Sequence, residues 1–260
     1  MAAVAWGLAV VTGASAGIGR EFCEQLAERG HDLLVVARDR ARLEELGRDL
    51  ERRRGVRVEV AEADLSVEAE VDRLADRLRA GEAPALLVNN AGFGTKGALA
   101  ETDSGPQAAM VRLHTLAPLR LTQAVLPGMV RRGSGAIVNV SSVASFVHSP
   151  GNANYCATKA YLTSLTQGLA LEVAGTGVQA QALCPGLTRT EFHQRMQAKG
   201  EGPAWAWLSV EQVVGESLTC LDRGGPVVCV PGAGYKILVP LIRLAPRGLI
   251  GWVARRRRRM

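Results

Sequence analysis

The sequence predicts an α/β protein whose core is one doubly wound, seven-stranded parallel sheet with helices on both faces. Two observations predict this class. Short apolar runs alternate along the chain with longer segments of helical periodicity, which is typical of right-handed crossover units. The 260 residues, 47% of them hydrophobic, contain no internal repeat and no interdomain linker, which indicates a single domain with one substantial core.

Seven apolar runs have the length of buried strands. They lie at residues 8–12, 32–37, 56–60, 85–88, 136–140, 177–183 and 226–230. Helical periodicity follows between them at residues 17–29, 39–53, 67–79, 107–131, 153–173 and 210–221. Residues 187–209 break the alternation and carry Phe192, Trp205 and Trp207. Ligands of doubly wound sheets bind beyond the carboxyl ends of the strands, so we interpret this segment as a substrate lid, with a plain long loop as the alternative.

The charge and the cysteines exclude several classes of protein. Of the net charge of +6, five charges come from Arg255 to Arg259, which leaves 26 basic and 25 acidic residues in the rest of the chain. Aromatic residues make up 4% and no nucleic-acid-reading motif is present, so nucleic-acid binding is not expected. The five cysteines are scattered without metal-ligand spacing, which predicts a reduced cytoplasmic protein with no metal site and no disulfides. No basic region precedes the first strand, so a cleaved secretory signal is not expected.

A glycine-rich turn follows the first strand and opens the first helix. Residues Thr12 to Gly19 read TGASAGIG. Glycines there let the backbone turn tightly and approach a pyrophosphate, while the helix N-terminus faces the negative charge. Its position between a strand and a helix predicts a dinucleotide site.

The end of the second strand indicates which dinucleotide is bound. A site for the 2′-hydroxyl of NAD(H) carries Asp or Glu there, whereas this chain has Arg38. A guanidinium can grip a 2′-phosphate but cannot accept a hydrogen bond from a hydroxyl, so NADP(H) is favoured. Arg20 and Arg42 are close enough in sequence to reinforce this contact. Ordinary solvated helix charge is the alternative for both, and we prefer it for Arg42.

Tyr155 and Lys159 are four residues apart in a predicted helix, so their side chains share one face. A neighbouring ammonium is expected to bring the pKa of the phenol down toward neutral pH, which makes Tyr155 a general acid for a carbonyl oxygen or a general base for an alcohol. An exposed tyrosine with a lysine one turn away is the ordinary alternative. Ser141 and Ser142 end the fifth strand, and only one of them can face this pair because adjacent strand residues point to opposite sides.

These features together resemble the short-chain dehydrogenase/reductase family, in its single-domain branch, over about residues 8–230. The resemblance rests on four motifs: TGxxxGxG at Thr12 to Gly19, NNAG at Asn89 to Gly92, the spacing of Ser142, Tyr155 and Lys159, and Pro185-Gly186 followed by Thr190. It implies a Rossmann-fold catalytic domain of residues 1–234, hydride transfer with NADP(H), and a homodimer or homotetramer.

The resemblance also assigns roles. Tyr155 donates a proton to the carbonyl, Lys159 lowers its pKa and binds the nicotinamide ribose, and Ser142, preferred over Ser141 by its spacing, orients the substrate oxygen. The expected cofactor contacts are Gly13, Ser15, Ala16, Gly17, Ile18, Gly19, Arg20, Arg38, Asp64, Leu65, Asn90, Ala91, Gly92, Tyr155, Lys159, Pro185, Gly186, Thr188 and Thr190.

His114 occupies the position where the resemblance implies an asparagine, a fourth catalytic member that helps to hold a water linked to the active-site lysine. A histidine can donate or accept through its ring nitrogens, so this relay can survive. An imidazole that titrates near about 6.5 beside Lys159 would instead make activity depend on pH. A tolerated structural replacement is the alternative that we prefer. His148 and His193 are further residues for the pocket, with solvent exposure as the preferred interpretation of both.

Residues 235–260 form an apolar and polybasic tail. Residues 237–253 include Pro240, Arg243, Pro246 and Arg247, so a membrane-spanning helix is not expected. An interfacial segment attracted to anionic lipid and an apolar segment packed on the body, at a dimer contact, are the two alternatives.

The sequence thus predicts an NADPH-dependent reductase that converts a ketone or aldehyde on an apolar molecule to an alcohol. The apolar tail and the lid tryptophans favour a 3-oxoacyl thioester or another lipid-like ketone, ahead of a steroid or xenobiotic carbonyl. Two rivals belong to other classes. One is a catalytically weak NADP(H)-binding sensor or scaffold, favoured if His114 breaks the relay, and the other is a membrane-interaction protein led by the tail. The expected location is the cytoplasm, with the periphery of a membrane as the second choice.

Overall fold

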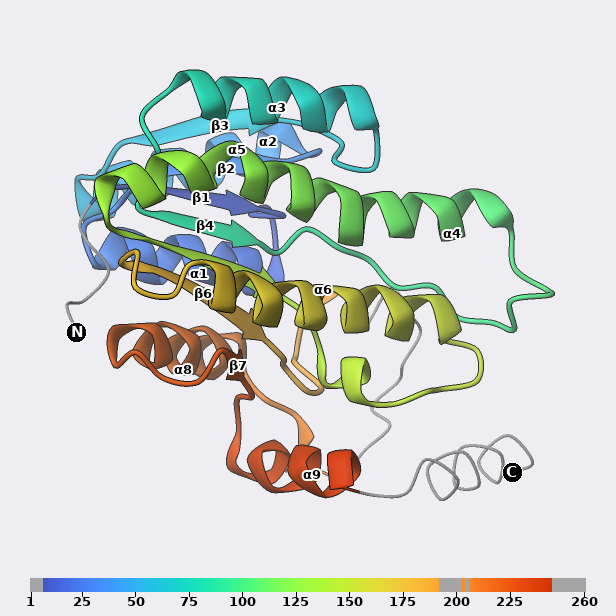
Figure 1. The fold of residues 1–260 in the computed structure, drawn as a ribbon. Coiled ribbons are helices and arrows are strands. Elements are labelled where there is room, and N and C mark those ends of the chain that lie inside the picture. The colour runs from blue at the N-terminus through green and yellow to red at the C-terminus, as the bar shows by residue number, and fades with distance from the viewer. Residues whose placement is uncertain (1–6, 192–202, 204–205, 245–260) are drawn as a thin grey trace.

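The computed structural model describes residues 7–191, 203 and 206–244, and a parallel sheet lies at its centre (Figure 1). Its strands are β1 (Leu8–Thr12), β2 (Asp32–Ala37), β3 (Val58–Glu62), β4 (Leu86–Asn89), β5 (Gly135–Val140), β6 (Val178–Leu183) and β7 (Val228–Cys229). Their order is β3-β2-β1-β4-β5-β6-β7, and all neighbouring pairs are parallel. The winding direction reverses between β1 and β4, and ligands of such sheets bind beside that reversal. The predicted doubly wound, seven-stranded sheet in one domain is confirmed.

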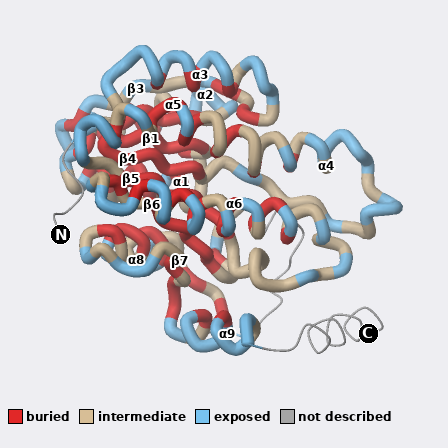
Figure 2. The backbone as a smooth tube through the Cα atoms, viewed as in Figure 1, coloured by how far each residue is buried: buried red, intermediate tan, exposed pale blue. Residues whose placement is uncertain are grey.

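Helices cover both faces of the sheet. The helices α1 (Gly17–Glu28), α2 (Arg40–Arg54) and α8 (Val210–Asp222) pack on one face, and α3 (Glu68–Ala80), α5 (Ala117–Arg132) and α6 (Ala153–Glu172) pack on the other. Alternate strand residues divide between two cores. Ala9 and Val11 share a cluster with Phe22 of α1, whereas Val10 shares one with Leu121 of α5. The strands are therefore buried on both sides, which explains their continuous apolar runs and their buried colour in Figure 2.

Three predicted elements differ from the structure by more than one residue at an end or in the type of helix. β3 begins at Val58, two residues later than the prediction, and β7 is only Val228–Cys229. The helix predicted at 107–131 is instead α4 (Ser104–Val111), a π-helical turn (Arg112–Leu116) and α5. A π-helical turn accommodates one extra residue and rotates the flanking helical faces, and such turns are frequent at functional sites. His114 lies within this one.

Helix α9 (Ala233–Leu244) crosses the boundary predicted between the domain and its tail. Tyr235 is buried, and its hydroxyl donates to the carbonyl oxygen of Ala206 (2.9 Å) and accepts from the N–H of Leu187 (3.0 Å). The first part of the predicted tail is therefore packed on the domain. In the described part of the chain, no helix combines the length and the apolar character needed to span a bilayer.

The two ends of the predicted lid, residues 187–209, are joined by backbone hydrogen bonds. The N–H of Leu208 donates to the carbonyl oxygen of Leu187 (2.8 Å), and the N–H of Arg189 donates to the carbonyl oxygen of Leu208 (3.0 Å). The rest of this segment, residues 192–202 and 204–205, lies outside the described residues. Predictions that concern Phe192, His193 and Trp205 fall there.

Candidate active site

A cavity of about 1120 Å³ lies at the carboxyl ends of the strands. The loops after β1, β2, β3, β4, β5 and β6 line it, and α9 adds one wall. It brings together the sequence-predicted residues Gly13, Ser15, Ala16, Gly17, Ile18, Arg38, Asp64, Leu65, Asn90, Ala91, Gly92, His114, Ser142, Tyr155, Lys159, Pro185, Gly186, Thr188 and Thr190. Gly19 and Arg20 are not part of the lining.

The glycine turn has the shape that a dinucleotide needs. Gly13 and Gly17 have φ angles of 67° and 57°, in the left-handed region that favours glycine. A Cβ atom on Gly19 would collide with the carbonyl oxygen of Gly13 and with the side chain of Asn90. Among the described residues, no side chain caps the N-terminus of α1. The first N–H groups of α1 are therefore available to an anion, and the turn fits a pyrophosphate.

Thr12 and Asn90 hold this turn in place. The hydroxyl oxygen of Thr12 accepts from the N–H of Asn90 (2.9 Å) and of Ala91 (3.1 Å). The side-chain amide of Asn90 donates to the carbonyl oxygens of Thr12 (2.8 Å) and Gly13 (3.2 Å). Asn90 and Thr12 thus fix the shape of the glycine turn, and Thr12 is a positioning residue to which the sequence patterns gave no role.

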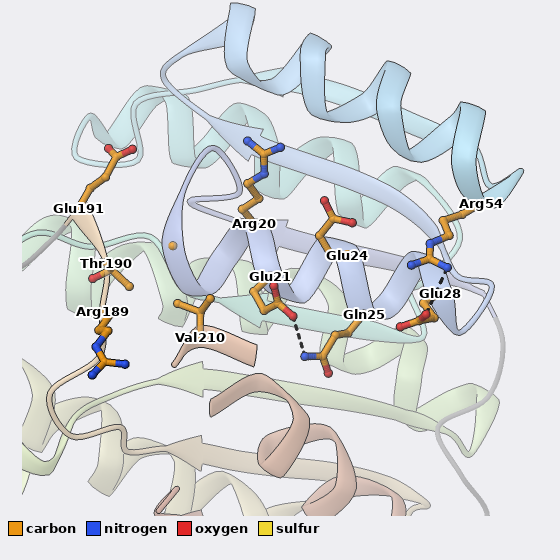
Figure 3. Close-up of a pocket in the computed structure, with 11 residues that line it drawn as sticks. Arg20, Glu21, Glu24, Gln25, Glu28, Arg54, Arg189, Thr190, Glu191 and Val210 are labelled. Atoms are coloured by element: carbon orange, nitrogen blue, oxygen red, sulfur yellow. Dashed lines mark hydrogen bonds and ion pairs between the residues drawn. The ribbon is translucent and has the colours of Figure 1, made fainter. Parts of the chain in front are cut away.

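The basic residues predicted around the 2′-phosphate differ in position. Arg38 lines the cavity, its side chain is 68% exposed, and its guanidinium lies 3.7 Å from the Asp64 carboxylate. Arg42 also lines the cavity but forms an ion pair with Glu191 (3.2 Å). Arg20 instead lies in a separate, more open hollow of about 510 Å³, where α1 carries several acidic side chains (Figure 3). Arg20 therefore does not line the large cavity, and its reinforcement of the phosphate contact stays a prediction.

The two serines after β5 point in different directions, as the strand alternation predicts. The Ser141 hydroxyl donates to the carbonyl oxygen of Lys159 (2.8 Å) and bonds to the Thr163 hydroxyl (2.7 Å), which fixes it against α6. The Ser142 hydroxyl accepts from the N–H of Ala144 (3.1 Å) and forms a hydrogen bond with Tyr155. Ser142 is therefore the serine that meets the phenol in the cavity.

The pKa of Tyr155 differs from the sequence prediction. Burial raises the pKa of its hydroxyl to about 12, although the hydrogen bond from Ser142 opposes this. The Lys159 ammonium donates to the carbonyl oxygen of Val140 (2.8 Å) and lies 5.8 Å from the centre of the Tyr155 ring. Burial lowers the pKa of Lys159 to about 8. The expected lowering of the Tyr155 pKa toward neutrality was wrong for this arrangement, because loss of solvation outweighs the distant ammonium.

His114 is buried, and both of its ring nitrogens form hydrogen bonds. Its Nε2 accepts from the N–H of Phe93 (3.1 Å), and its Nδ1 lies 3.0 Å from the hydroxyl of Thr158, which itself donates to the carbonyl oxygen of Tyr155 (2.9 Å). This pattern requires the neutral ring with its proton on Nδ1. Burial first, and repulsion from Lys159 second, hold the pKa of His114 well below 6.5. These contacts are those of a structural link between the β4 loop and α6, which agrees with the preferred interpretation of His114 and not with the alternative of titration near 6.5.

The far end of the cavity has an apolar wall that the sequence patterns did not assign to a helix. Leu238, Val239 and Ile242 of α9 line it, next to Tyr235. A Cβ atom on Gly186 would collide with the Tyr235 ring, so this glycine lets α9 close against the β6 loop. The spacing of residues 235, 239 and 242 is helical and was the available signal. His148 is exposed, in agreement with the interpretation preferred for it.

The family follows from a comparison with known proteins. A family model described as short chain dehydrogenase matches residues 7–201. The chain belongs to this family. A short-chain dehydrogenase from Sphingobium yanoikuyae, solved in complex with NADPH, is 36% identical, with a TM-score of 0.85 over 94% of this chain and 95% of that one. The bulky-bulky ketone specific alcohol dehydrogenase from Comamonas testosteroni is 34% identical, with a TM-score of 0.79 over 94% and 93%. A very-long-chain 3-oxoacyl-CoA reductase from Laccaria bicolor is 37% identical over 69% of this chain and 53% of that protein.

Membership of the short-chain dehydrogenase family makes this an oxidoreductase whose cavity serves a nicotinamide cofactor. The uncapped start of α1 and the cradle around Gly13 and Gly19 fit such a cofactor, which supplies or accepts a hydride when bound. The protein's own contribution is a phenol that carries its proton at neutral pH, held by the Ser142 hydroxyl. Such a phenol can donate a proton to an oxygen that enters the cavity.

Proposed function

We propose that this protein reduces a ketone or aldehyde on an apolar molecule to the alcohol, with NADPH as the hydride donor. The observation that carries this proposal is that Ser142, Tyr155 and Lys159 line one cavity, where the Tyr155 phenol forms a hydrogen bond with Ser142 and burial raises its pKa. Reduction of a carbonyl consumes a proton at its oxygen, whereas oxidation of an alcohol first requires an ionised base. A phenol that keeps its proton at neutral pH therefore supports reduction as the proposed direction.

Three side chains divide the proton chemistry in this proposal. Ser142 holds the carbonyl oxygen, and Tyr155 gives that oxygen its proton. The phenolate left on Tyr155 is then stabilised by Lys159, one helical turn away, which is still an ammonium at neutral pH with its pKa of about 8. Lys159 also binds the nicotinamide ribose, as the family resemblance implies.

NADPH is proposed over NADH because Arg38 stands at the rim of the cavity, where an NADH site has a carboxylate. The related structure with bound NADPH supports the same choice. Arg38→Glu should lower kcat/KM for NADPH by about 10- to 100-fold, the value of one or two charge-assisted hydrogen bonds, and should change that for NADH much less. Arg48→Glu is a matched control, because Arg48 is exposed on α2, the helix that follows Arg38 in the chain, and does not line the cavity. Equal losses with both cofactors would contradict the proposed role of Arg38.

The substrate is proposed to be a 3-oxoacyl thioester or another lipid-like ketone, with steroid and xenobiotic carbonyls as the next class. The apolar wall of Leu238, Val239 and Ile242 supports this proposal. Two relatives named for a bulky ketone and for a 3-oxoacyl-CoA point the same way.

The direct test is turnover of NADPH with ketones of increasing apolar size, with the alcohol product identified. We expect kcat/KM to rise with apolar size. Binding of NADPH without turnover of any carbonyl would instead support the alternative of a sensor or scaffold. A homodimer or homotetramer in the cytoplasm remains a prediction, which light scattering and cell fractionation can check.

A further inference from the structure

Helix α9 (Ala233–Leu244) is apolar on two opposite faces. Its inner face, with Tyr235 and Val239, is buried and lines the cavity. Its outer face carries Ile237, Leu241 and Leu244, whose spacings of four and three residues align them on one side of the helix. These three side chains are 66%, 61% and 83% exposed. Figure 2 shows α9 as a largely exposed helix at the edge of the molecule.

Exposed apolar side chains gather on α9 more than on any other element of the described chain. The other large ones are spread singly or in pairs over the surface, at Val67, Leu99, Val111, Val130, Tyr161 and Leu171. Isolated apolar residues are normal on a protein surface, whereas a contiguous stripe marks an interaction site. The outer face of α9 is therefore the candidate interaction surface of the described chain.

Charge indicates what kind of partner this is. Residues 225–260 contain eight basic residues and no acidic residue, while the rest of the chain holds the other 23 basic and all 25 acidic residues. On α9 itself, Arg243 is exposed, with its guanidinium 5.9 Å from the centre of the Phe146 ring. Lys236 is engaged with Glu216 (2.7 Å) and contributes less. An apolar stripe bordered by basic groups is typical of a helix that lies in the surface of an anionic bilayer.

The same helix connects this surface to the cavity. Leu238 is 38% exposed and also lines the cavity, and the half-buried Ile242 lines it too. The apolar surface thus continues from the outside of α9 to the inside. An apolar molecule that leaves a bilayer at α9 meets apolar side chains on its way to the cavity.

We propose that the outer face of α9, formed by Ile237, Leu241 and Leu244, docks on an anionic lipid surface, and that the cavity takes its substrate from that lipid. Docking does not depend on turnover. The second half rests on the proposed function and narrows its substrates to ketones that partition into a bilayer. A second copy of the chain is the other occupant that an apolar stripe can bind.

Vesicle flotation with the full chain tests docking, with phosphatidylcholine vesicles prepared with and without phosphatidylserine. We expect binding only to the vesicles that contain phosphatidylserine, and weaker binding at high salt. The triple variant Ile237→Ser, Leu241→Ser, Leu244→Ser should weaken binding on the order of 100-fold, because three apolar side chains no longer leave water. Leu99→Ser with Leu171→Ser is the matched control and should leave binding unchanged, since these residues are 62% and 80% exposed on other elements. Melting curves identify any variant that is not folded.

Two results would overturn docking through α9. One is full vesicle binding by the triple variant, with loss only when Arg255 to Arg259 are removed, because the contact would then belong to the tail alone. The other is an absence of vesicle binding together with a dimer that the triple variant abolishes, because the occupant would then be a second copy. Vesicle binding without reduction of any ketone would leave docking intact and remove the proposed function.

Discussion

Replacement of Lys159 by methionine should remove activity and yet stabilise the protein at neutral pH. Lys159 is 5% exposed, and burial lowers its pKa from the ordinary 10.5 to about 8. A difference of that size corresponds to about 3 kcal/mol that the folded state loses by keeping the ammonium charged. Methionine has a similar length and no charge, but it leaves the Val140 carbonyl oxygen without the lysine, which costs about 1 kcal/mol. The expected net gain is about 2 kcal/mol at pH 7.

The sign of the pH dependence follows from the depressed pKa. Below about pH 8 both the folded and the unfolded state hold the proton, so the full cost of the buried charge is present. Between about pH 8 and 10.5 only the unfolded state holds it, so the wild-type protein gains stability relative to the variant as the pH rises. The free energy of unfolding of Lys159→Met should therefore fall relative to that of the wild type by about 1.4 kcal/mol per pH unit in this window. Above the window the variant should be less stable than the wild type by about 1 kcal/mol.

Denaturant unfolding of both proteins at several pH values from neutral to alkaline measures this difference. The comparison of the two proteins cancels the titration of groups that they share. A variant that is less stable than the wild type at pH 7, by an amount that does not change with pH, would show that burial of the charge does not dominate at Lys159.

Two further predictions concern residues that shape the site. His114→Asn should lower the free energy of unfolding by about 1 to 3 kcal/mol, because one buried hydrogen bond to Phe93 or Thr158 is lost. The same variant should leave the pH–rate profile between pH 6 and 8 unchanged. An inflection near 6.5 in the wild type that the variant lacks would show that His114 titrates. Gly19→Ala should weaken NADPH binding at least about 10-fold, because its Cβ atom collides with the backbone of the glycine turn, and fluorescence titration with an unchanged Kd would contradict this geometry.

The sheet and the glycine turn were predictable because strong local patterns encode them. Strands buried on both faces must be continuously apolar, and this pattern located β1 and β2 to the residue. The turn from Gly13 to Gly19 was predictable because the structure leaves no room for a Cβ atom at Gly13 and Gly19, so the sequence must have glycine there. The choice of Ser142 over Ser141 likewise agrees with the alternation of a strand.

The charge states in the cavity were not predictable because they depend on burial and on distant partners. The four-residue spacing of Tyr155 and Lys159 correctly predicted that both residues lie on one helix, but it did not reveal that the Lys159 ammonium donates to the carbonyl oxygen of Val140. Nor could the sequence show that Phe93 and Thr158 occupy both ring nitrogens of His114. These contacts join residues 19 or more positions apart, which only the folded chain brings together.

The central claim is that Tyr155 is the acid of a carbonyl reductase. Its most direct test compares wild type and Tyr155→Phe in the NADPH-dependent reduction of a bulky apolar ketone, with NADPH affinity measured in parallel by fluorescence. We expect kcat to fall by about 100- to 10,000-fold while the Kd for NADPH stays within a few-fold, because only the proton donor is removed. Reduction by Tyr155→Phe at the wild-type rate, with NADPH bound equally well, would contradict it.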